Sequence, residues 1–435
     1  MKAVARKGLV LLGAASLSLL SALASPATTA TTAIVNAKVY AMTGVDAIEH
    51  GTVVIRDGRV QSVGNNLTVP AGAEVIDAGG RIVTPGLMNG GSQLGLVEVS
   101  SAEDSADQSV ANGPLGAAFD VQYALNPNST LLAVARADGL TRAVSFPTGS
   151  SGAPFSGTGV VLRLSESPDL VDRPKVAMFA VAGGMAADSV GGSRSAQWIL
   201  LRNALDEARQ FTPSRKPAPP RDQLLNRLNV EALKPVVDGR MPLVIQATRE
   251  SDIRQAVRLA DDYSLEVIIL GGQEAWRAAD LLAARKIAVV LNPFDDLPWT
   301  FDEIGARPDN AALLARAGVT IAFSVPGIHM SHDAGSVIRE AAGLAVANGL
   351  PWIEGLRAIT TNPARVFGID DHYGTLAAGM EADLAIWDGD PLQPTSAPVK
   401  VFVAGRAVSL TTRQSLLRDR YSPLRKSDGW PPGYH

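Results

Sequence analysis

The middle of the chain alternates short apolar runs with longer segments of helical periodicity. Apolar runs such as residues 141–146 and 265–270 are separated by helical stretches such as 251–263. Strands that alternate with helices form parallel sheets, because each crossover must return the chain to the same end of the sheet. Over residues 84–374 this alternation predicts an α/β fold, and a (β/α)8 TIM-type barrel is the closure favoured at this length. A doubly wound open sheet is the alternative.

Two strand-rich segments flank this barrel region. Residues 33–83 contain short strand-like runs around the tight-turn signal Asp57-Gly58. Residues 375–412 have the same texture, with a second hairpin around Ala404-Gly405. We therefore expect one small composite β-sandwich domain built from both ends of the chain, followed by a C-terminal tail over 413–435.

The first segment is typical of a secretory signal peptide. Basic residues precede an apolar run over 9–23, and small residues at 22 and 24 form a cleavage site after Ala24. We predict a signal peptide over 1–24 and a flexible lead-in over 25–32, with export to the periplasm if the source is a Gram-negative bacterium. A retained N-terminal anchor is the alternative, although so short an apolar run is marginal for a hydrocarbon core of ~30 Å. No membrane association is expected after cleavage.

Charge and composition exclude several classes of function. The chain has 39 basic and 43 acidic residues, for a net charge of −4. Strong electrostatic capture of nucleic acid needs a basic excess, so no nucleic-acid partner is expected. Cysteine is absent, which excludes disulfides, a thiol nucleophile and a cysteine-type zinc site. Histidine occurs five times in 435 residues, so imidazole ligands are scarce.

Motifs at both junctions of the barrel region are similar to those of the amidohydrolase superfamily. Residues 84–89 (TPGLMN) resemble the segment that leads from the small β domain into the first barrel strand. Residues 358–368 (AITTNPARVFG) and 374–383 (GTLAAGMEAD) resemble the closing helix and the return to the β domain. The texture is nearest to the imidazolonepropionase-like amidohydrolases. The resemblance implies a metal-dependent hydrolase that acts on C–N bonds other than ordinary peptide bonds.

The sequence departs from this family at the metal ligands that the resemblance implies. Members carry His-x-His after the first strand, His after the fifth and sixth strands, and Asp after the eighth. The aligned positions here hold residues that cannot replace imidazole or carboxylate ligands, namely Gly91, Gln93, Gln246, Gly271, Gly272 and Ser324. A hydrolytic zinc site needs three or four such ligands and an open water position. We therefore predict that no zinc or similar cofactor is bound, and that these six residues line a pocket at the former metal position.

One other group of titratable residues follows the predicted eighth strand. His329, His332 and Asp333 could hold one metal ion or act in acid–base catalysis, since barrels carry their chemistry at this end. The alternative is an ordinary loop in which Asp333 caps the next helix.

Two hypotheses of function therefore remain from the sequence. The first is a hydrolase of C–N bonds whose metal-dependent chemistry is altered or lost. The second is a pseudoenzyme that serves as a non-catalytic ligand-binding or scaffold protein. A small polar molecule is the expected ligand or substrate under either hypothesis, and a homo-oligomer is compatible with the sequence.

Overall fold

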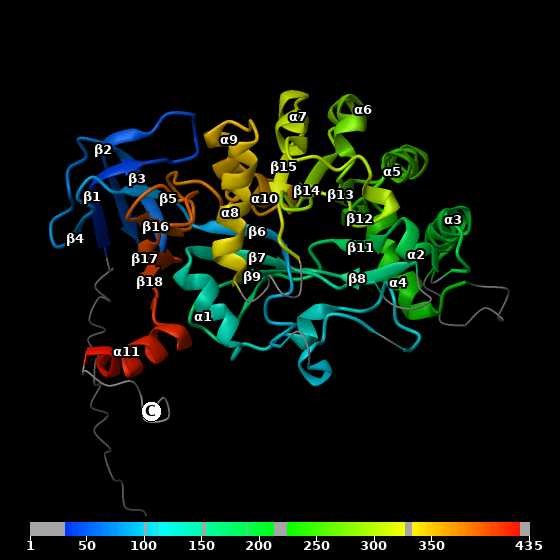
Figure 1. The fold of residues 1–435 in the computed structure, drawn as a ribbon, viewed down its shortest axis with the longest axis horizontal. Coiled ribbons are helices and arrows are strands. Elements are labelled where there is room, and N and C mark those ends of the chain that lie inside the picture. The colour runs from blue at the N-terminus through cyan, green and yellow to red at the C-terminus, as the bar shows by residue number, and fades with distance from the viewer. Residues whose placement is uncertain are drawn as a thin grey trace, which may run out of the picture.

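The computed structural model describes residues 31–99, 102–110, 112–149, 154–188, 190–212, 224–326 and 333–426. The predicted signal peptide lies outside these residues. The described chain forms three β-sheets with helices packed along them (Figure 1). Within the described ranges, no helix combines the length and the apolar character that crossing a membrane requires.

The first sheet takes its strands from both ends of the chain. Its order is β18-β17-β16-β5-β1-β2-β3, and β4 pairs with β1 beside this path. The hairpin of β2 and β3 turns at Asp57-Gly58, and that of β17 and β18 turns at Ala404-Gly405, as the turn signals predict. The strands are β1 Thr31–Val39, β2 Ile48–Arg56, β3 Arg59–Asn65, β4 Glu74–Asp77, β5 Ile82–Pro85, β16 Leu384–Trp387, β17 Pro398–Val403 and β18 Arg406–Ala407.

The middle of the chain forms the other two sheets, which are mixed. One has the order β10-β9-β7-β6, and the other has the order β15-β14-β13-β12-β11-β8. In the second sheet β11 to β15 are all parallel, as the alternation of strands and helices predicts. The strands are β6 Leu87–Ser92, β7 Leu140–Ser145, β8 Phe155–Thr158, β9 Val160–Arg163, β10 Val171–Arg173, β11 Met178–Val181, β12 Leu243–Ala247, β13 Val267–Gly271, β14 Ala288–Leu291 and β15 Ile321–Phe323.

The strands β8 and β9 run antiparallel to their neighbours, which corrects the expectation of a wholly parallel barrel. β9 pairs antiparallel with β7, and β8 pairs antiparallel with β11. A parallel strand needs a crossover of a dozen or more residues, whereas residues 146–154 are too few to hold a helix and return. Only Gly159 separates β8 from β9, and a Cβ there would lie 2.5 Å from the Phe179 ring. Glycine therefore lets this strand pass from one sheet to the other against β11.

The two middle sheets are also joined at their other edges, between β6 and β15. The amide of Val325 donates to the carbonyl of Gly91 at 3.1 Å. A Cβ on Gly90 would lie 2.8 Å from the carbonyl oxygen of Phe323, so the backbones can approach this closely only because Gly90 has no side chain. Neither seam was visible in the sequence.

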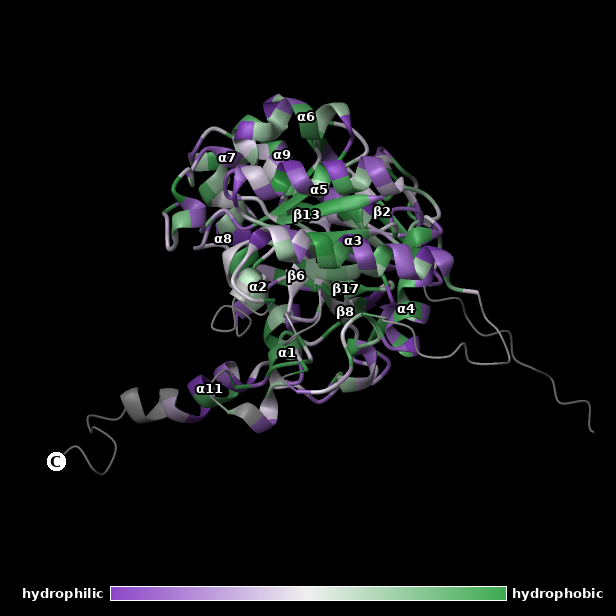
Figure 2. Cartoon of the chain, turned by 90° about the vertical axis from the view of Figure 1, so that its right-hand side faces the viewer, coloured by the Kyte–Doolittle hydropathy of each residue, from purple (hydrophilic) through white to green (hydrophobic). Residues whose placement is uncertain are grey.

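Helices cover the outer faces of the middle strands. Figure 2 shows the hydrophobic strand β13 lying among helices that carry hydrophilic outer positions. After β13, a 3-10 turn precedes the short helix α6. The helices are α1 Thr130–Ala137, α2 Gly184–Asp188, α3 Arg194–Gln210, α4 Arg227–Val237, α5 Glu250–Tyr263, α6 Ala279–Ala284, α7 Asn310–Arg316, α8 Ala334–Ala347, α9 Trp352–Arg357, α10 Thr361–Val366 and α11 Arg413–Lys426, and the 3-10 turns are η1 Glu103–Ser105, η2 Val121–Ala124, η3 Ala275–Ala278 and η4 Phe301–Glu303.

The buried side chains form separate cores. The largest lies mainly between the helices and the middle strands, and another fills the sheet made by the chain ends. A further cluster takes at least one side chain from each of eight middle strands, among them Met88, Val144, Val161, Phe179, Val244, Ile268, Val290 and Ala322. Within it, the rings of Phe146 and Phe179 stack with centroids 4.9 Å apart.

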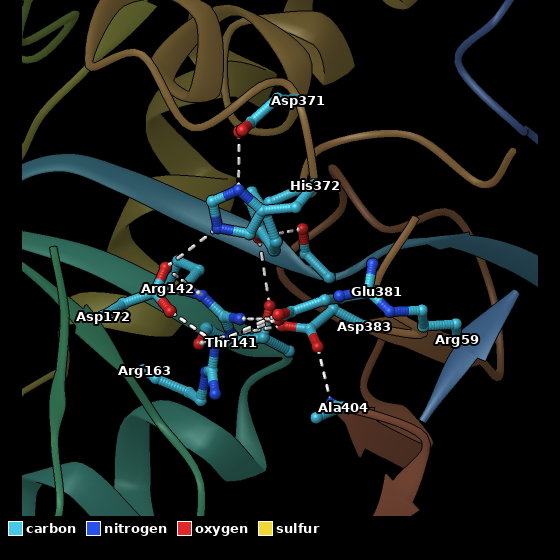
Figure 3. A network of polar contacts seen from close by, with 12 residues as sticks. Arg59, Thr141, Arg142, Arg163, Asp172, Asp371, His372, Glu381, Asp383 and Ala404 are labelled. Atoms are coloured by element: carbon cyan, nitrogen blue, oxygen red, sulfur yellow. Dashed lines mark hydrogen bonds and ion pairs between the residues drawn. The ribbon is translucent and has the colours of Figure 1, made fainter. Parts of the chain in front are cut away.

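A buried ion-pair network joins the sheet of the chain ends to the middle sheets (Figure 3). Arg142 on β7 is fully buried, and its guanidinium contacts Asp172 on β10 at 3.3 Å and Glu381 at 2.5 Å. It also pairs with Asp383, which directly precedes β16 and accepts a hydrogen bond from the amide of Ala404 at 2.6 Å. One cation thus binds three carboxylates from segments far apart in the chain.

Further side chains extend this network around Asp172 and Glu381. Arg163 on β9 contacts Asp172 at 2.5 Å and Glu381 at 3.1 Å. Burial works against the charged form of Asp172, but Arg142 and Arg163 outweigh it and hold the pKa of this carboxyl below its ordinary value. His372 lies 3.4 Å from Asp172, so it contributes a further donor. These contacts offset the cost of burying the charges.

Replacement of Arg142 by methionine tests this network. The variant leaves three carboxylates without their shared cation, and the loss of one partner of a buried ion pair costs about 3–5 kcal/mol. We expect the free energy of unfolding at pH 7, measured by urea denaturation followed by circular dichroism, to fall by this amount. Lowering the pH should narrow the difference, since protonated carboxyls no longer need the guanidinium.

Arg240→Met is the matched control for this substitution. The Arg240 side chain is 64% exposed and pairs with Asp238 on the surface, so its loss should change the free energy of unfolding by less than about 1 kcal/mol. Equal effects of the two substitutions would show that the buried network does not hold the two parts together.

Candidate functional site

A cavity of about 580 Å³ lies at the carboxyl ends of β11, β12, β13 and β14. Gln246 and Thr248 come from the end of β12, Gln273 follows β13, and Asp295 follows β14. The carboxyl ends of parallel strands meet at one edge, so side chains far apart in the sequence line one space. This is the end at which α/β folds place their ligands.

Asp295 is the titratable group at the centre of the cavity's polar wall. Its carboxylate accepts hydrogen bonds from Nε2 of Gln273 at 3.1 Å and from Nδ2 of Asn292 at 3.0 Å. Burial raises the pKa of Asp295 to about 6, and the negative charges of Glu303 and Asp296 act in the same direction. This carboxyl therefore changes its charge near neutral pH, which is typical of functional sites.

Arg194, the first residue of α3, also lines the cavity. Its guanidinium contacts Asp252 at 3.2 Å and also pairs with Asp302. Asp302 in turn accepts a hydrogen bond from the amide of Gly184 at 2.9 Å. Two carboxylates thus neutralise the positive charge of Arg194 and hold its side chain in place beside the cavity.

An apolar lip borders the cavity between β14 and α7. Trp299 is 85% exposed and Phe301 is 90% exposed, and both line the cavity. The turn that carries them is held by Glu303, whose carboxylate accepts a hydrogen bond from the amide of Trp299 at 2.8 Å. Two large aromatic side chains therefore stand in solvent beside a polar cavity.

The predicted pocket residues are brought near the same end of the strands, but they play different parts. Gln246 lines the cavity. Gly91 and Ser324 lie side by side in the β6–β15 seam, since a Cβ on Gly91 would lie 3.1 Å from that of Ser324. Gly271 and Gly272 have left-handed backbones with φ values of 90° and 63°, and they turn the chain so that Gln273 reaches Asp295.

Gln93 and Asp333 complete the predicted residues that the structure describes. Gln93 is 1% exposed, and neither its Oε1 nor its Nε2 has a hydrogen-bond partner among the described residues. Asp333 is exposed and precedes α8, but among the described residues its side chain forms no capping hydrogen bond. Asp333 thus occupies the predicted N-cap position, but the amide of Ser336 donates to Asp138 instead, at 3.2 Å. His329 and His332 lie outside the described residues.

The donor set at the strand ends does not fit the zinc site that the family resemblance implies. Within the described ranges, no three His, Cys, Asp or Glu side chains gather where a metal ion could be held. The aligned positions offer glycine, glutamine and serine, and a carboxamide is a weak ligand for zinc. The resemblance also implies a lysine ligand on a middle strand in many members, but Lys175 precedes β11, is 57% exposed and lies 3.6 Å from Asp120.

A second cavity of about 550 Å³ lies at the amino end of β15. Its lining includes Arg316, Arg357 and Arg365. Arg357 pairs with Glu354 at 2.5 Å, and Nε of Arg316 donates to the carbonyl of Ala312 at 3.2 Å. Arg316 and Arg365 are exposed, and this cavity lies at the opposite end of the strand from the end at which α/β folds place their ligands.

The sequence alone did not identify the residues that build the cavity. Asp295, Gln273, Arg194 and Trp299 were all missed. One signal was available, since the segment 292–295 (NPFD) places a carboxylate just after the apolar run 287–291. Its partner Gln273 follows a different strand, and only the pairing of β13 with β14 brings the two side chains together.

Comparison with protein families and curated proteins gives a consistent result. The model of the amidohydrolase family matches residues 279–409. The amidohydrolase tasK of Hapsidospora irregularis is 23% identical over 397 residues, which are 82% of this chain and 40% of that protein. The chain therefore spans less than half the length of tasK. The imidazolonepropionase of Mesorhizobium japonicum is 24% identical over 377 residues, which are 79% of this chain and 88% of that protein.

Solved structures show the same fold. An amidohydrolase from Thermotoga maritima MSB8 superposes with a TM-score of 0.77 and 23% identity, over 87% of this chain and 99% of that one. An adenosine deaminase from Xanthomonas campestris with bound zinc superposes with a TM-score of 0.52 and 19% identity, over 91% of this chain and 98% of that one. At this identity the likeness concerns the fold alone.

Substitution of Asp295 by asparagine tests the electrostatics of the cavity. In the folded protein the pKa of Asp295 is about 6, above the ordinary value of 3.8. The folded state then binds more protons than the unfolded state between these values, so this group lowers stability as the pH rises from 4 to 6. Between pH 4 and pH 6 the free energy of unfolding should therefore fall less in Asp295→Asn than in the unmodified protein. We expect the difference to be about 2 kcal/mol, after allowance for the partial exposure of Asp295.

Asp138→Asn is the comparison variant for this measurement by urea denaturation. Burial also raises the pKa of Asp138 to about 6, but this carboxyl contacts α8 and does not line the cavity. Asp138→Asn should change the pH dependence of the free energy of unfolding in the same direction as Asp295→Asn, and it should leave the cavity unchanged. An unchanged pH profile in Asp295→Asn would contradict the raised pKa.

Proposed function

The chain belongs to the amidohydrolase superfamily, and we propose that it binds a small polar organic molecule at the carboxyl ends of β11–β14 without the metal-dependent hydrolysis of its relatives. The observation that carries this proposal is a cavity of about 580 Å³ beside strand ends that hold Gly91, Gln246 and Ser324 in place of metal ligands. Cavities of this size at this end of an α/β fold are the usual place for a small ligand.

We interpret the two middle sheets as one barrel of the (β/α)8 type with an antiparallel third strand. Two observations support this interpretation. The sheets are hydrogen-bonded to each other at Gly159 and at the Val325–Gly91 seam. The buried cluster that draws on eight strands is also what the packed interior of such a barrel requires. The strand ends around the cavity would then form one rim.

Hydrolysis of a C–N bond other than a peptide bond is the second candidate, and Asp295 favours it. A carboxyl with a pKa of about 6 can act as a general base near neutral pH. In that case Asp295 would accept a proton from the attacking water and return it to the leaving nitrogen. The side chains of Gln246 and Gln273 would orient the amide that is attacked. Export and a periplasmic location stay predictions from residues 1–24.

Metal analysis of the purified full-length protein tests the main proposal. We expect well under one zinc or manganese ion per chain by mass spectrometry, and no change in Tm on addition of EDTA. Stoichiometric metal would contradict the proposal, because the strand ends would then hold a cation with side chains that we exclude as ligands.

Ligand screening by thermal shift tests the binding role directly. Small amides such as hydantoin, 2-pyrrolidone and glycylproline should include at least one that raises the Tm, and a ligand at 100 times its Kd stabilises by about 2.7 kcal/mol. Gln246→Ala should remove the shift. Absence of any shift with these compounds, or with charged relatives of them, would count against a ligand-binding role.

A further inference from the structure

The cavity carries more information about its ligand than polarity alone. We propose that the ligand is an organic cation with a flat apolar group, such as an amidinium, guanidinium or aryl-ammonium compound. Its charged end would lie between Asp295 and Glu303, and its apolar part would lie against Trp299 and Phe301. This inference rests on the proposed binding function and names the class of molecule bound there.

The charged groups that line the cavity favour a cation. They are Arg194, Asp295, Asp302 and Glu303. The charge of Arg194 is already matched by Asp302 and by Asp252. Asp295 and Glu303 form no ion pair with any cation in the described part of the chain. A cationic ligand would supply the missing partner, whereas an anion would meet two carboxylates and no unpaired cationic side chain.

The hydrogen-bonding groups point the same way. Asp295 already accepts bonds from Gln273 and Asn292, and the lone pairs left on its carboxylate can accept more. Oε1 of Gln273 is buried and has no hydrogen-bond partner among the described residues. A buried carbonyl oxygen without a donor is uncommon, so a donor from outside the chain is expected to complete it. Amidinium and guanidinium groups carry several N–H donors and no acceptor.

The aromatic lip supplies the second half of the site. Trp299 and Phe301 are largely exposed, and Leu297 and Ile304 on the same loop are 70% and 64% exposed. Exposed apolar side chains that gather beside a cavity are typical of a binding surface. Aromatic faces also attract cations, and indole does so most strongly. The aromatic lip would therefore pack against the flat apolar group of the ligand and also attract its positive charge.

Three probes of nearly the same shape separate charge from size. Benzamidinium, benzamide and benzoate share a phenyl ring with a planar substituent and differ in charge by one unit at each step. Isothermal titration of the full-length protein at pH 7.5 and low salt should give the tightest binding for benzamidinium. We expect at least a tenfold weaker affinity for benzamide and no detectable binding of benzoate.

Variants identify the groups responsible. Glu303→Gln keeps an acceptor for the Trp299 amide but removes the charge, so it should weaken benzamidinium at least fivefold and leave benzamide unchanged. Trp299→Ala should weaken both probes, since it removes the apolar face. Tyr123→Ala is the matched control, because Tyr123 is also 85% exposed but does not line the cavity. Circular dichroism would verify that each variant is folded.

The outcomes separate this inference from the proposed function. Benzamide or benzoate binding as tightly as benzamidinium would overturn the cation assignment, and so would a failure of benzamidinium to bind. The ligand-binding role would survive either result if a neutral or anionic probe still bound and Gln246→Ala removed its binding. If no probe of any charge bound, both proposals would fail.

Discussion

The buried guanidinium of Arg142 is the contact on which the arrangement of this protein depends. It binds carboxylates from β10 and from the segment before β16, so the middle sheets and the sheet of the chain ends meet around one cation. A charge at this depth is tolerated only if every partner is in place, because its desolvation must be offset by close ion pairs. The network therefore specifies one docking of the two parts.

Arg142 and the cavity involve different residues. The guanidinium network joins the middle strands to the sheet of the chain ends, whereas Gln273 and Asp295 follow the carboxyl ends of β13 and β14. Loops at the carboxyl ends can change without disturbing the buried pairs, because those pairs do not involve them. This separation allows residues at the strand ends to vary while the buried ion pairs stay in place.

The cavity has a different electrostatic basis from a metal centre. A metal site concentrates ligands on one ion, whereas here the polar groups are spread along a wall. Arg194 is neutralised by its own carboxylate partners, and Asp295 is held by two carboxamides in a setting that raises its pKa. The left-handed backbone at Gly271 and Gly272 places Gln273 within reach of Asp295, so these glycines help to build the polar wall of the cavity.

The sequence by itself determined the two terminal hairpins and the parallel run of strands, because turn residues and apolar periodicity act over a few neighbouring positions. The family motifs at both junctions are likewise short segments of sequence. The sequence also places glycine at position 91 and serine at position 324, where the family resemblance implies metal ligands. Only the tertiary structure decided that the strand around Gly159 runs antiparallel, that Asp138 accepts from an amide in the first turn of α8, and that Asp295 meets Gln273. Each of these depends on which strands and helices become neighbours, and that choice is made by packing over long sequence separations, which no local pattern records.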